Sequence, residues 1–521
     1  MANMLIRTRQ FKCYNTATII RVVLFFGIPS VYLLWYSDGP SPSDYTGEDA
    51  GFTARKLLGV IEREQKNCTH AAILEFPPDG FTRIERQHGF IMVHCVIAVY
   101  CFLLLGSVCE QYFVPAIELI CERLDIGTDV AGATFMAAAS SSPELFINCV
   151  GTFVTEGDLG VGAVVGSAVF NVLAVPACCA LIAGRVVELD WWSVSRDCVM
   201  YAVAVVALIL TLLDDVVYWH EALLLVLMYT LYILAMIFNG RLGSFARSGC
   251  CSFNKSKGYT EITPLINNNK ISPLDAARHM KGLVQRNDVE NGMEMSRRHD
   301  STGSDTSTSS VWSWPSEKTS MFWKLFWILT WPISLVLWAT IPDCRRRPSL
   351  YPLTFGMCIT WIGGVSYLVA WMITVLGDTL NLPDSITGLT ILAAGTSLPE
   401  AVSSVLVTKQ GYGTMGISNS IGSNTFDILL CLGLPWLVKS LAYPTVPGNH
   451  WVTINSSGLS YSAISLLSTL FALYGCLALN KFQLDWKIGV TCTVIYVGYL
   501  ALASLIELNV FFVVNLPMCP H

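Results

Sequence analysis

Charged side chains are scarce in this sequence. Asp, Glu, Lys and Arg make up only 13% of its 521 residues, whereas 53% are hydrophobic. Soluble domains carry about 25% charged residues, so the composition excludes an ordinary soluble protein. Apolar runs of about 20 residues recur along the chain, and a helix of that length crosses a bilayer. The sequence therefore predicts a polytopic membrane protein.

Paired cysteines and a protease motif are missing as well. The 18 Cys stand mostly in apolar runs, and no two have the C-x-x-C spacing of zinc and redox motifs. We interpret them as small buried side chains. The Gly-x-Gly-Asp motif typical of an intramembrane aspartyl protease is also absent from the sequence. We expect no enzymatic activity, no resident cofactor and no nucleic-acid partner.

Apolar and polar stretches divide the chain into five segments. Residues 1–36 have a basic start and an apolar run, which predicts a signal sequence or a first membrane anchor. Residues 37–88 are polar, and we expect them to be extracellular or lumenal. Residues 89–240 and 352–515 form two membrane halves, and 241–351 form a cytosolic loop between them. The predicted spans lie near 90–109, 127–153, 160–184, 197–213, 218–239, 352–376, 383–408, 415–438, 460–479 and 488–509.

The apolar run at 322–342 is long enough to cross a membrane. It has basic residues on both sides, however: Lys318 and Lys324 before it and Arg345–Arg347 after it. The positive-inside rule places both of its ends in the cytosol. We therefore predict that this segment lies along the membrane surface or re-enters the membrane.

Two motifs recur at one fixed offset. GATFMAAASSSPE begins at Gly132 and GLTILAAGTSLPE at Gly388, which is 256 residues later. GSAVFN begins at Gly166 and GSNTFD at Gly422, again 256 residues later. A shared offset without a gap is hard to obtain from composition alone. The chain therefore contains an internal repeat, with one copy in each half.

The order of the spans predicts that the two copies are inverted. With 37–88 outside and 322–342 not crossing, the Glu144 span runs from inside to outside and the Glu400 span runs the opposite way. The sequons at Asn67 and Asn455 then both fall outside, where N-glycans are added. Many secondary transporters use such repeats to build a midplane site. We predict an all-α polytopic fold of two inverted five-helix repeats.

Three acidic residues lie inside predicted spans: Glu144, Glu400 and Asp427. An ionised carboxylate there costs about 3 kcal/mol or more, so it needs a partner. The interiors of the spans that hold these acids contain no Lys or Arg with which a buried ion pair could form. The remaining partners are protons, water and bound cations.

The residues around these acids supply oxygen atoms. Pro143 and Pro399 precede Glu144 and Glu400, and each removes a helical hydrogen bond and frees a carbonyl. A site of carboxylate, carbonyl, hydroxyl and amide oxygens suits Ca²⁺, Na⁺ or K⁺ better than zinc or copper. Three ionised acids carry a charge of about −3, which one Ca²⁺ and one monovalent cation, or several Na⁺, would neutralise. Mutually exclusive occupancy by these two sets predicts coupled exchange.

The repeat motifs resemble those of the potassium-dependent sodium/calcium exchangers, within the cation/calcium exchanger superfamily. The resemblance covers roughly 85–240 and 320–515. It rests on DVAGATFMAAASSSPELF with GSAVFN and on GLTILAAGTSLPE with SNSIGSNTFDILL. It implies that Glu144 and Glu400 bind Ca²⁺ and Na⁺, and that Na⁺ enters while Ca²⁺ and K⁺ leave. The further oxygen ligands that it implies are Ser141, Ser167, Asn171, Thr396, Ser397, Ser423 and Asn424.

Asp427 indicates the branch of this superfamily. The potassium-independent branch usually has Asn there, together with a large Ca²⁺-sensing insert that the loop at 241–320 cannot hold. The chain also departs from the usual pattern twice. Glu400 stands where this branch commonly has Asp, and Ala139–Ser142 stand where Gly and Ala are usual. The first change lengthens an acidic side chain, and the second tightens helix packing or adds hydroxyl ligands.

Potassium-independent Na⁺/Ca²⁺ exchange and H⁺/Ca²⁺ exchange are the alternative functions, because isolated carboxylates also titrate. A channel would not require inverted halves with matched acids. The partners that we expect are the lipid bilayer, the transported Ca²⁺, Na⁺ and K⁺, and N-glycans at Asn67 or Asn455. We expect the plasma membrane as the location, with an intracellular organelle as the alternative.

Overall fold

The structure is a computed structural model of the chain. It describes residues 72–124, 137–155, 158–184, 186–214, 216–237, 321–345, 347–409, 411–443, 451–453 and 458–511. The predictions for residues 1–71, for the loop at 241–320 and for the sequons at Asn67 and Asn455 lie outside these ranges.

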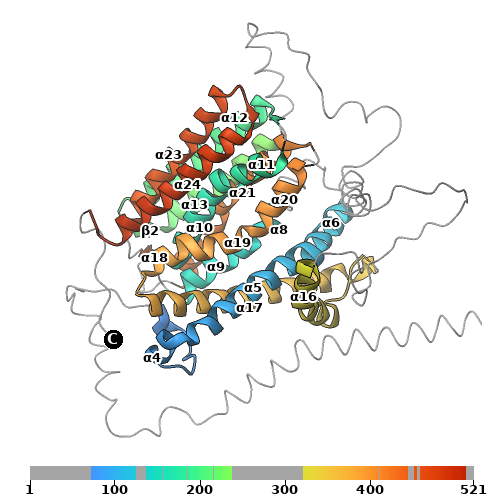
Figure 1. Ribbon diagram of the computed structural model, residues 1–521, viewed down its shortest axis with the longest axis vertical. Coiled ribbons are helices and arrows are strands. Elements are labelled where there is room, and N and C mark those ends of the chain that lie inside the picture. Colours follow the sequence, from blue (N-terminus) through green and yellow to red (C-terminus); the bar gives the residue numbers. More distant parts are fainter. Residues whose placement is uncertain are drawn as a thin grey trace, which may run out of the picture.

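The described chain is mainly helical (Figure 1). The first half contains η3 (Ala72–Glu75), α4 (Arg83–Glu85), η4 (Arg86–Phe90), α5 (Ile91–Val108), η5 (Cys109–Phe113), α6 (Val114–Arg123), α8 (Ala137–Ser140), α9 (Ser142–Phe153), α10 (Leu159–Val169), η7 (Phe170–Ala174), α11 (Val175–Ala183), β1 (Val187–Glu188), α12 (Trp191–Leu212), β2 (Val216–Tyr218) and α13 (Trp219–Ile237). The second contains α16 (Met321–Thr340), η8 (Pro348–Leu350), α17 (Tyr351–Leu380), α18 (Asp384–Thr387), η9 (Gly388–Leu392), α19 (Ala393–Thr396), α20 (Leu398–Lys409), α21 (Gly413–Phe426), η10 (Asp427–Leu432), α22 (Gly433–Ala442), β3 (Trp451–Thr453), α23 (Gly458–Leu479), β4 (Gln483–Leu484) and α24 (Trp486–Glu507).

Eight helical segments of the described chain are long and apolar enough to cross a membrane, and a bent pair of helices at 384–409 would be a ninth. These nine correspond to nine of the predicted spans, and the tenth, near 127–153, is described only from Ala137 onward. The first span is longer than predicted, because the helix runs from Arg83 to Arg123 instead of ending near 109. It continues through η5 into the charged residues of α6, which hydropathy alone assigns to a loop.

The repeat inferred from the motifs is visible in the helix boundaries. Helix α9 spans 142–153 and helix α20 spans 398–409, so both their beginnings and their ends differ by the same 256 residues as the motifs. Each follows a break in its helix, at Ser141 and at Ser397. In both halves the next helix passes into a π-helical turn, η7 or η10. The two copies therefore share a backbone plan as well as a sequence motif.

Proline accounts for several of the π-helical turns. The turns η5, η7 and η10 end two or three residues before Pro115, Pro176 and Pro435 respectively. Proline has no backbone N–H and crowds the carbonyl four residues earlier, so the α-helical ladder is interrupted there. The π-helical turn absorbs that interruption without ending the span.

The helices pack around two apolar cores. One core joins α5, α9, α16 and α17, and the other joins α10 to α13 with α21 to α24. In Figure 1, α5 and α17 run side by side along one edge of the bundle, and α23 and α24 lie along the opposite edge. The helices that carry the repeat motifs, among them α9, α10 and α19, lie between these edges. The motif residues therefore occupy the middle of the protein.

Glycines let the repeat helices approach one another closely. A Cβ atom on Gly160 would lie 2.6 Å from Asn148 Oδ1, and one on Gly416 would lie 2.6 Å from Thr408 Oγ1. Gly160 and Gly416 are again 256 residues apart, and the Cβ on Gly416 would also lie 2.8 Å from the carbonyl oxygen of Ser404, which is the counterpart of Asn148. A Cβ on Gly388 would lie 2.6 Å from the Leu159 carbonyl oxygen, where the two halves meet. Small residues are the usual means of close packing between membrane helices.

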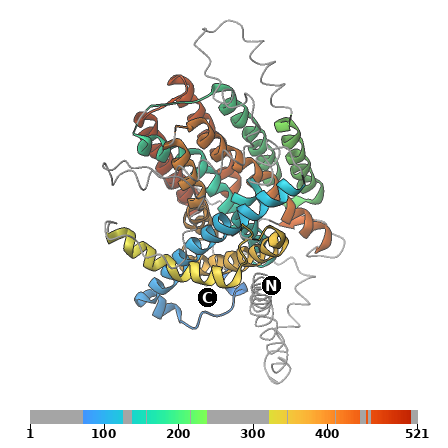
Figure 2. The same cartoon turned by 90° about the vertical axis from the view of Figure 1, so that its right-hand side faces the viewer.

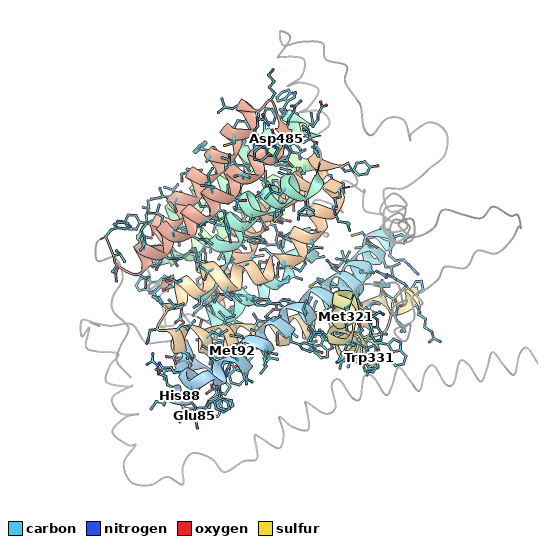
Figure 3. All side chains as sticks on the ribbon, viewed as in Figure 1. Glu85, His88, Met92, Met321, Trp331 and Asp485 are labelled. Atoms are coloured by element: carbon cyan, nitrogen blue, oxygen red, sulfur yellow. The ribbon has the colours of Figure 1, made fainter. Side chains whose placement is uncertain are left out.

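Short strands join loops that the predicted topology places on the same side of the membrane. Strand β1 pairs with β4 and strand β2 pairs with β3, both antiparallel. The topology places β1 and β4 inside and β2 and β3 outside, so each pair joins loops of one side. Figure 3 labels Glu85 and Asp485 at opposite ends of the bundle, which are also predicted to lie on opposite sides. Met92, 62% exposed on α5, is an example of the apolar surface between these ends.

Helix α16 contains the ambiguous run at 322–342. It is seen almost end-on in Figure 1 and lengthwise in Figure 2, so it runs crosswise to α5 and α17. It packs against α5, and its Ile333 and Leu337 side chains are buried. The prediction that this segment does not cross the membrane remains a prediction.

The two equivalent glycines at 166 and 422 differ in their surroundings, which provides a test of the packing. A Cβ on Gly166 would collide with the Leu389 carbonyl oxygen and lie 2.7 Å from Ala393 Cβ, whereas a Cβ on Gly422 would meet Tyr232 Oη at 3.6 Å. We expect Gly166→Ala to destabilise the protein by about 1–3 kcal/mol through overpacking. Thermal unfolding in detergent should show a lowered midpoint for Gly166→Ala and an unchanged one for Gly422→Ala. Equal midpoints for the two variants would contradict this packing.

Candidate cation-binding site

All ten residues that the sequence singled out are buried. Each is 3% exposed or less. They come from both repeats: Ser141, Glu144, Ser167 and Asn171 from the first, and Thr396, Ser397, Glu400, Ser423, Asn424 and Asp427 from the second.

The two glutamates sit at equivalent places on broken helices. Glu144 is the third residue of α9 and Glu400 is the third residue of α20, each directly after a proline. Proline fits the first turn of a helix, where its missing N–H is not needed. Acidic side chains in that turn are stabilised by the helix dipole. The break in each span therefore creates a place where a carboxylate can be held in the interior.

Glu400 is surrounded by hydrogen-bond donors from both repeats. Ser141 Oγ donates to its Oε1 at 3.2 Å, Asn171 Nδ2 donates to Oε2 at 2.7 Å, and Ser423 Oγ donates to Oε2 at 3.3 Å. The Ser141 and Asn171 bonds cross between the halves. Glu400 is longer than the Asp that is usual at this position, and its carboxylate oxygens contact side chains of the opposite repeat.

The two asparagines join the central helices of the repeats. Asn171 Nδ2 also lies 3.2 Å from Asn424 Oδ1, and Asn424 Nδ2 donates to the Ala168 carbonyl at 3.3 Å. Ser420 Oγ donates to the Asn171 carbonyl at 2.5 Å. Asn171 Oδ1 has no hydrogen-bond partner among the residues that the structure describes. An amide oxygen buried without a partner is available to a cation.

Glu144 and Asp427 are less well satisfied than Glu400. Both Glu144 carboxylate oxygens and Asp427 Oδ2 lack a hydrogen-bond partner in the described chain, although Thr396 and Ser397 lie near enough to Glu144 to interact with its charge. Asp427 Oδ1 contacts Cys431 Sγ at 3.7 Å. Both Glu144 and Glu400 act electrostatically on Asp427.

No Lys or Arg in the described chain forms an ion pair with any of the three acids. The arginines pair with other acids instead. Arg83 pairs with Asp378, and Arg86 pairs with both Asp79 and Asp378. Arg196 pairs with Asp197. Three mutually repelling acids therefore occupy the interior without a positive side chain to neutralise them. Burial of an unpaired charge is costly, so this arrangement calls for another positive charge.

Two of the predicted hydroxyl ligands bond to their own helices. Ser167 Oγ donates to the Val164 carbonyl at 3.0 Å, and Thr396 Oγ1 lies 3.2 Å from the carbonyls of Leu392 and Ala393. Donation uses the hydroxyl hydrogen and leaves oxygen lone pairs for another contact. Ser397 Oγ has no hydrogen-bond partner in the described part of the chain.

The extra serines of the first repeat have different roles. The Ser141 hydroxyl reaches Glu400, as described above. The Ser142 hydroxyl donates to the Ala139 carbonyl at 3.0 Å, which is the carbonyl that Pro143 frees. It also lies 3.6 Å from Cys109 Sγ. Ser141 therefore contributes a contact to the site, and Ser142 supplies a hydrogen bond to the backbone beside it.

The carboxylates alone do not form a ready metal cluster. Within the described ranges, no group of three or more His, Cys, Asp and Glu side chains is arranged to hold a metal ion. A cation bound here must also use hydroxyl, amide and carbonyl oxygens. Such mixed oxygen donors suit Ca²⁺ and alkali cations.

Three residues beside the site were not predicted from the sequence: Asn148, Ser420 and Cys431. Asn148 Nδ2 donates to the Cys431 carbonyl at 2.6 Å, and Cys431 Sγ also lies 3.8 Å from the Ser141 carbonyl. Asn148 and Cys431 each follow an acid by four residues, at Glu144 and Asp427. A search for polar residues one helical turn beyond Glu144 would have found Asn148, whereas Cys431 was interpreted as a small buried side chain.

Comparison with known proteins agrees with the motifs and the geometry. The family model described as "Sodium/calcium exchanger protein" matches residues 94–238 and 350–505. Human sodium/potassium/calcium exchanger 3 is 36% identical over 91% of this chain and 92% of its own length. Human sodium/potassium/calcium exchanger 5 is 37% identical over 85% of this chain and 89% of its own length.

A solved structure, that of the sodium/calcium exchanger from Methanococcus jannaschii, is 16% identical, with a TM-score of 0.42 over 79% of this chain and 98% of that one. The assignment rests on the sequence comparisons and on the repeat. The chain belongs to the sodium/calcium exchanger protein family, and within it to the sodium/potassium/calcium exchangers.

Proposed function

We propose that this protein is a secondary active antiporter that moves Na⁺ in one direction and Ca²⁺ together with K⁺ in the other. The observation that carries the proposal is that Glu144, Glu400 and Asp427 are buried close enough to repel one another, with no Lys or Arg of the described ranges paired to them. Transported cations supply the missing positive charge. The mechanism needs no covalent chemistry and no resident cofactor.

Each donor has a role in this mechanism. Glu144 and Glu400 bind Ca²⁺ in one half of the cycle and Na⁺ in the other, with oxygen contacts from Ser141, Asn171 and Ser423. Ser167, Thr396, Ser397 and Asn424 complete the ligand set that we propose. Ca²⁺ and K⁺ together carry a charge of about +3, which matches the three ionised acids. Na⁺ ions compete for the same oxygens, so the two sets of cations exclude each other and exchange is coupled.

Asp427 is the residue to which we assign K⁺. The equivalent position in the first repeat is Asn171, so the two halves differ by one negative charge at the centre of the site. A site with this extra charge needs one more monovalent cation than a site that has an amide at both positions. The relatives of this chain are named sodium/potassium/calcium exchangers, which favours K⁺ participation over the potassium-independent and proton-coupled alternatives.

The inverted repeat provides the means of alternating access. Two copies of one helix arrangement in opposite orientations can open the same site first to one side and then to the other. The multi-pass helices place the protein in a membrane, and we propose the plasma membrane, with the loop at 241–351 in the cytosol. The N-glycan that we propose for Asn67 or Asn455 lies on the exoplasmic side.

Replacement of either glutamate tests the site. We expect Glu144→Gln and Glu400→Gln to abolish Na⁺-driven Ca²⁺ uptake into proteoliposomes, because each removes a negative charge that a bound cation neutralises. Size-exclusion chromatography of the purified variants controls for folding. Normal uptake by a folded variant would refute the role of that glutamate.

Replacement of Asp427 tests the role of K⁺. In vesicles with an imposed Na⁺ gradient, the wild-type protein should take up Ca²⁺ only when K⁺ is present on the Ca²⁺ side. Asp427→Asn should take up Ca²⁺ without K⁺, because the amide matches Asn171 and needs no additional cation. Uptake that follows a pH gradient instead of a Na⁺ gradient would favour proton coupling.

Glycosylation tests the predicted sides of the membrane. Digestion with a peptide N-glycosidase should increase the gel mobility of the protein expressed in animal cells. The shift should be absent once both Asn67→Gln and Asn455→Gln are present. A glycan attached within the loop at 241–320 would contradict the predicted topology.

A further inference from the structure

The turn that carries Asp427 is tied to the helix that carries Glu144. Asn148, on α9, donates from Nδ2 to the backbone carbonyl of Cys431, in η10, at 2.6 Å. Asn148 is 1% exposed and Cys431 is fully buried. A buried hydrogen bond from a side chain to the backbone fixes the distance between the two elements that it joins.

The sequence explains why this carbonyl accepts a side-chain bond. In an α-helix the Cys431 carbonyl would accept from the backbone N–H of residue 435, but that residue is Pro435 and has no N–H. A carbonyl left without a partner inside a membrane protein is costly. The Asn148 amide supplies the missing donor. Gly160 leaves room for it, because a Cβ there would lie 2.6 Å from Asn148 Oδ1.

The bond lies one helical turn from both acids. Asn148 follows Glu144 by four residues, and Cys431 follows Asp427 by four, so each pair shares a helix face. Cys431 Sγ lies 3.7 Å from Asp427 Oδ1 and 3.8 Å from the carbonyl of Ser141, the residue at the break before α9. Movement of the turn relative to α9 would therefore move the Asp427 carboxylate relative to Glu144.

The opposite half has no such bond among its described residues. The positions equivalent to Asn148 and Cys431 are Ser404 and Val175, 256 residues away in each case. The Ser404 side chain is shorter, and its Oγ is buried without a hydrogen-bond partner in the described chain. In the described chain, this hydrogen bond is therefore present beside the acid Asp427 and absent beside its neutral counterpart, Asn171.

A second contact joins the same two parts of the protein. Lys439, on α22, donates from Nζ to the carbonyl of Thr152, near the end of α9, at 2.6 Å. The position equivalent to Lys439 is Ala183, which has no donor in its side chain. Two side-chain hydrogen bonds thus connect helix α9 to its neighbours, one to η10 and one to α22. Neither bond has an equivalent among the described residues of the other repeat.

We infer that Asn148 is a positioning residue for K⁺: it holds the Asp427 turn against α9, so that the Asp427 carboxylate faces the shared site at a fixed distance from Glu144. The inference rests on the proposed function, in which Asp427 binds K⁺. Asn148 itself touches the backbone of the turn and acts on the cation through Asp427. Its loss therefore weakens K⁺ binding more than Ca²⁺ binding.

The test uses the purified full-length protein in proteoliposomes with an imposed Na⁺ gradient, and measures Ca²⁺ uptake at varied K⁺ and varied Ca²⁺. For Asn148→Ala we expect the half-saturating K⁺ concentration to rise about fivefold, the order of effect of one lost buried hydrogen bond. The KM for Ca²⁺ should stay within about twofold of wild type. The matched control, Ser404→Ala, should leave both values unchanged.

A second variant keeps the test decisive if Asn148→Ala does not fold. Asn148→Ser gives the first repeat the residue that the second repeat has at this position, and its short side chain cannot reach the Cys431 carbonyl. It should shift the K⁺ dependence in the same direction. An unchanged K⁺ dependence in the folded variant, or an equal loss of Ca²⁺ and K⁺ affinity, would overturn the inference and leave the proposed function standing. Uptake by the wild-type protein that ignores K⁺ would overturn the proposed function itself.

Discussion

A negative charge inside a helical membrane protein needs a positive partner, and the organisation of this chain follows from that requirement. Glu144, Glu400 and Asp427 are buried together, and the basic residues that form ion pairs in the described chain are paired elsewhere. Hydroxyl and amide donors around Glu400 compensate part of its charge, whereas neither carboxylate oxygen of Glu144 has a hydrogen-bond partner among the residues that the structure describes. A site whose acids are not fully neutralised by protein side chains retains affinity for cations. A site in which Lys or Arg paired with those acids would not.

The same site depends on interruptions of the backbone. The helices break at Ser141 and Ser397, and π-helical turns carry Asn171 and Asp427. Proline lies near each of these interruptions, because a residue without an N–H frees a carbonyl that the helix would otherwise use. Some of those carbonyls accept hydrogen bonds from side chains. The Ala139 carbonyl, for example, accepts one from the Ser142 hydroxyl. Irregular backbone is tolerated at this depth because protein surrounds it on every side.

The two repeats share a backbone and differ in a few side chains. Equal helix boundaries place the acids Glu144 and Glu400 in matching positions, as two oppositely oriented halves require. The differences are concentrated where the halves meet. Asp427 has the neutral Asn171 as its counterpart in the other repeat, and Asn148 has Ser404 as its counterpart. In the proposed mechanism, symmetry of the backbone makes the site accessible from two sides, and asymmetry of the side chains distinguishes the cations.

The sequence by itself predicted most of the spans, the 256-residue repeat and the three interior acids, because hydropathy and motif spacing are properties of local sequence. The resemblance to known exchangers added the other seven candidate ligands. Tertiary structure alone decided the partners of those residues. That Glu400 accepts hydrogen bonds from Ser141 and Asn171, that α16 runs crosswise and that Asn148 reaches the Cys431 carbonyl all depend on contacts between helices far apart in the chain. Periodicity shows which face of a helix is buried, but the residue opposite that face is set by how the helices pack.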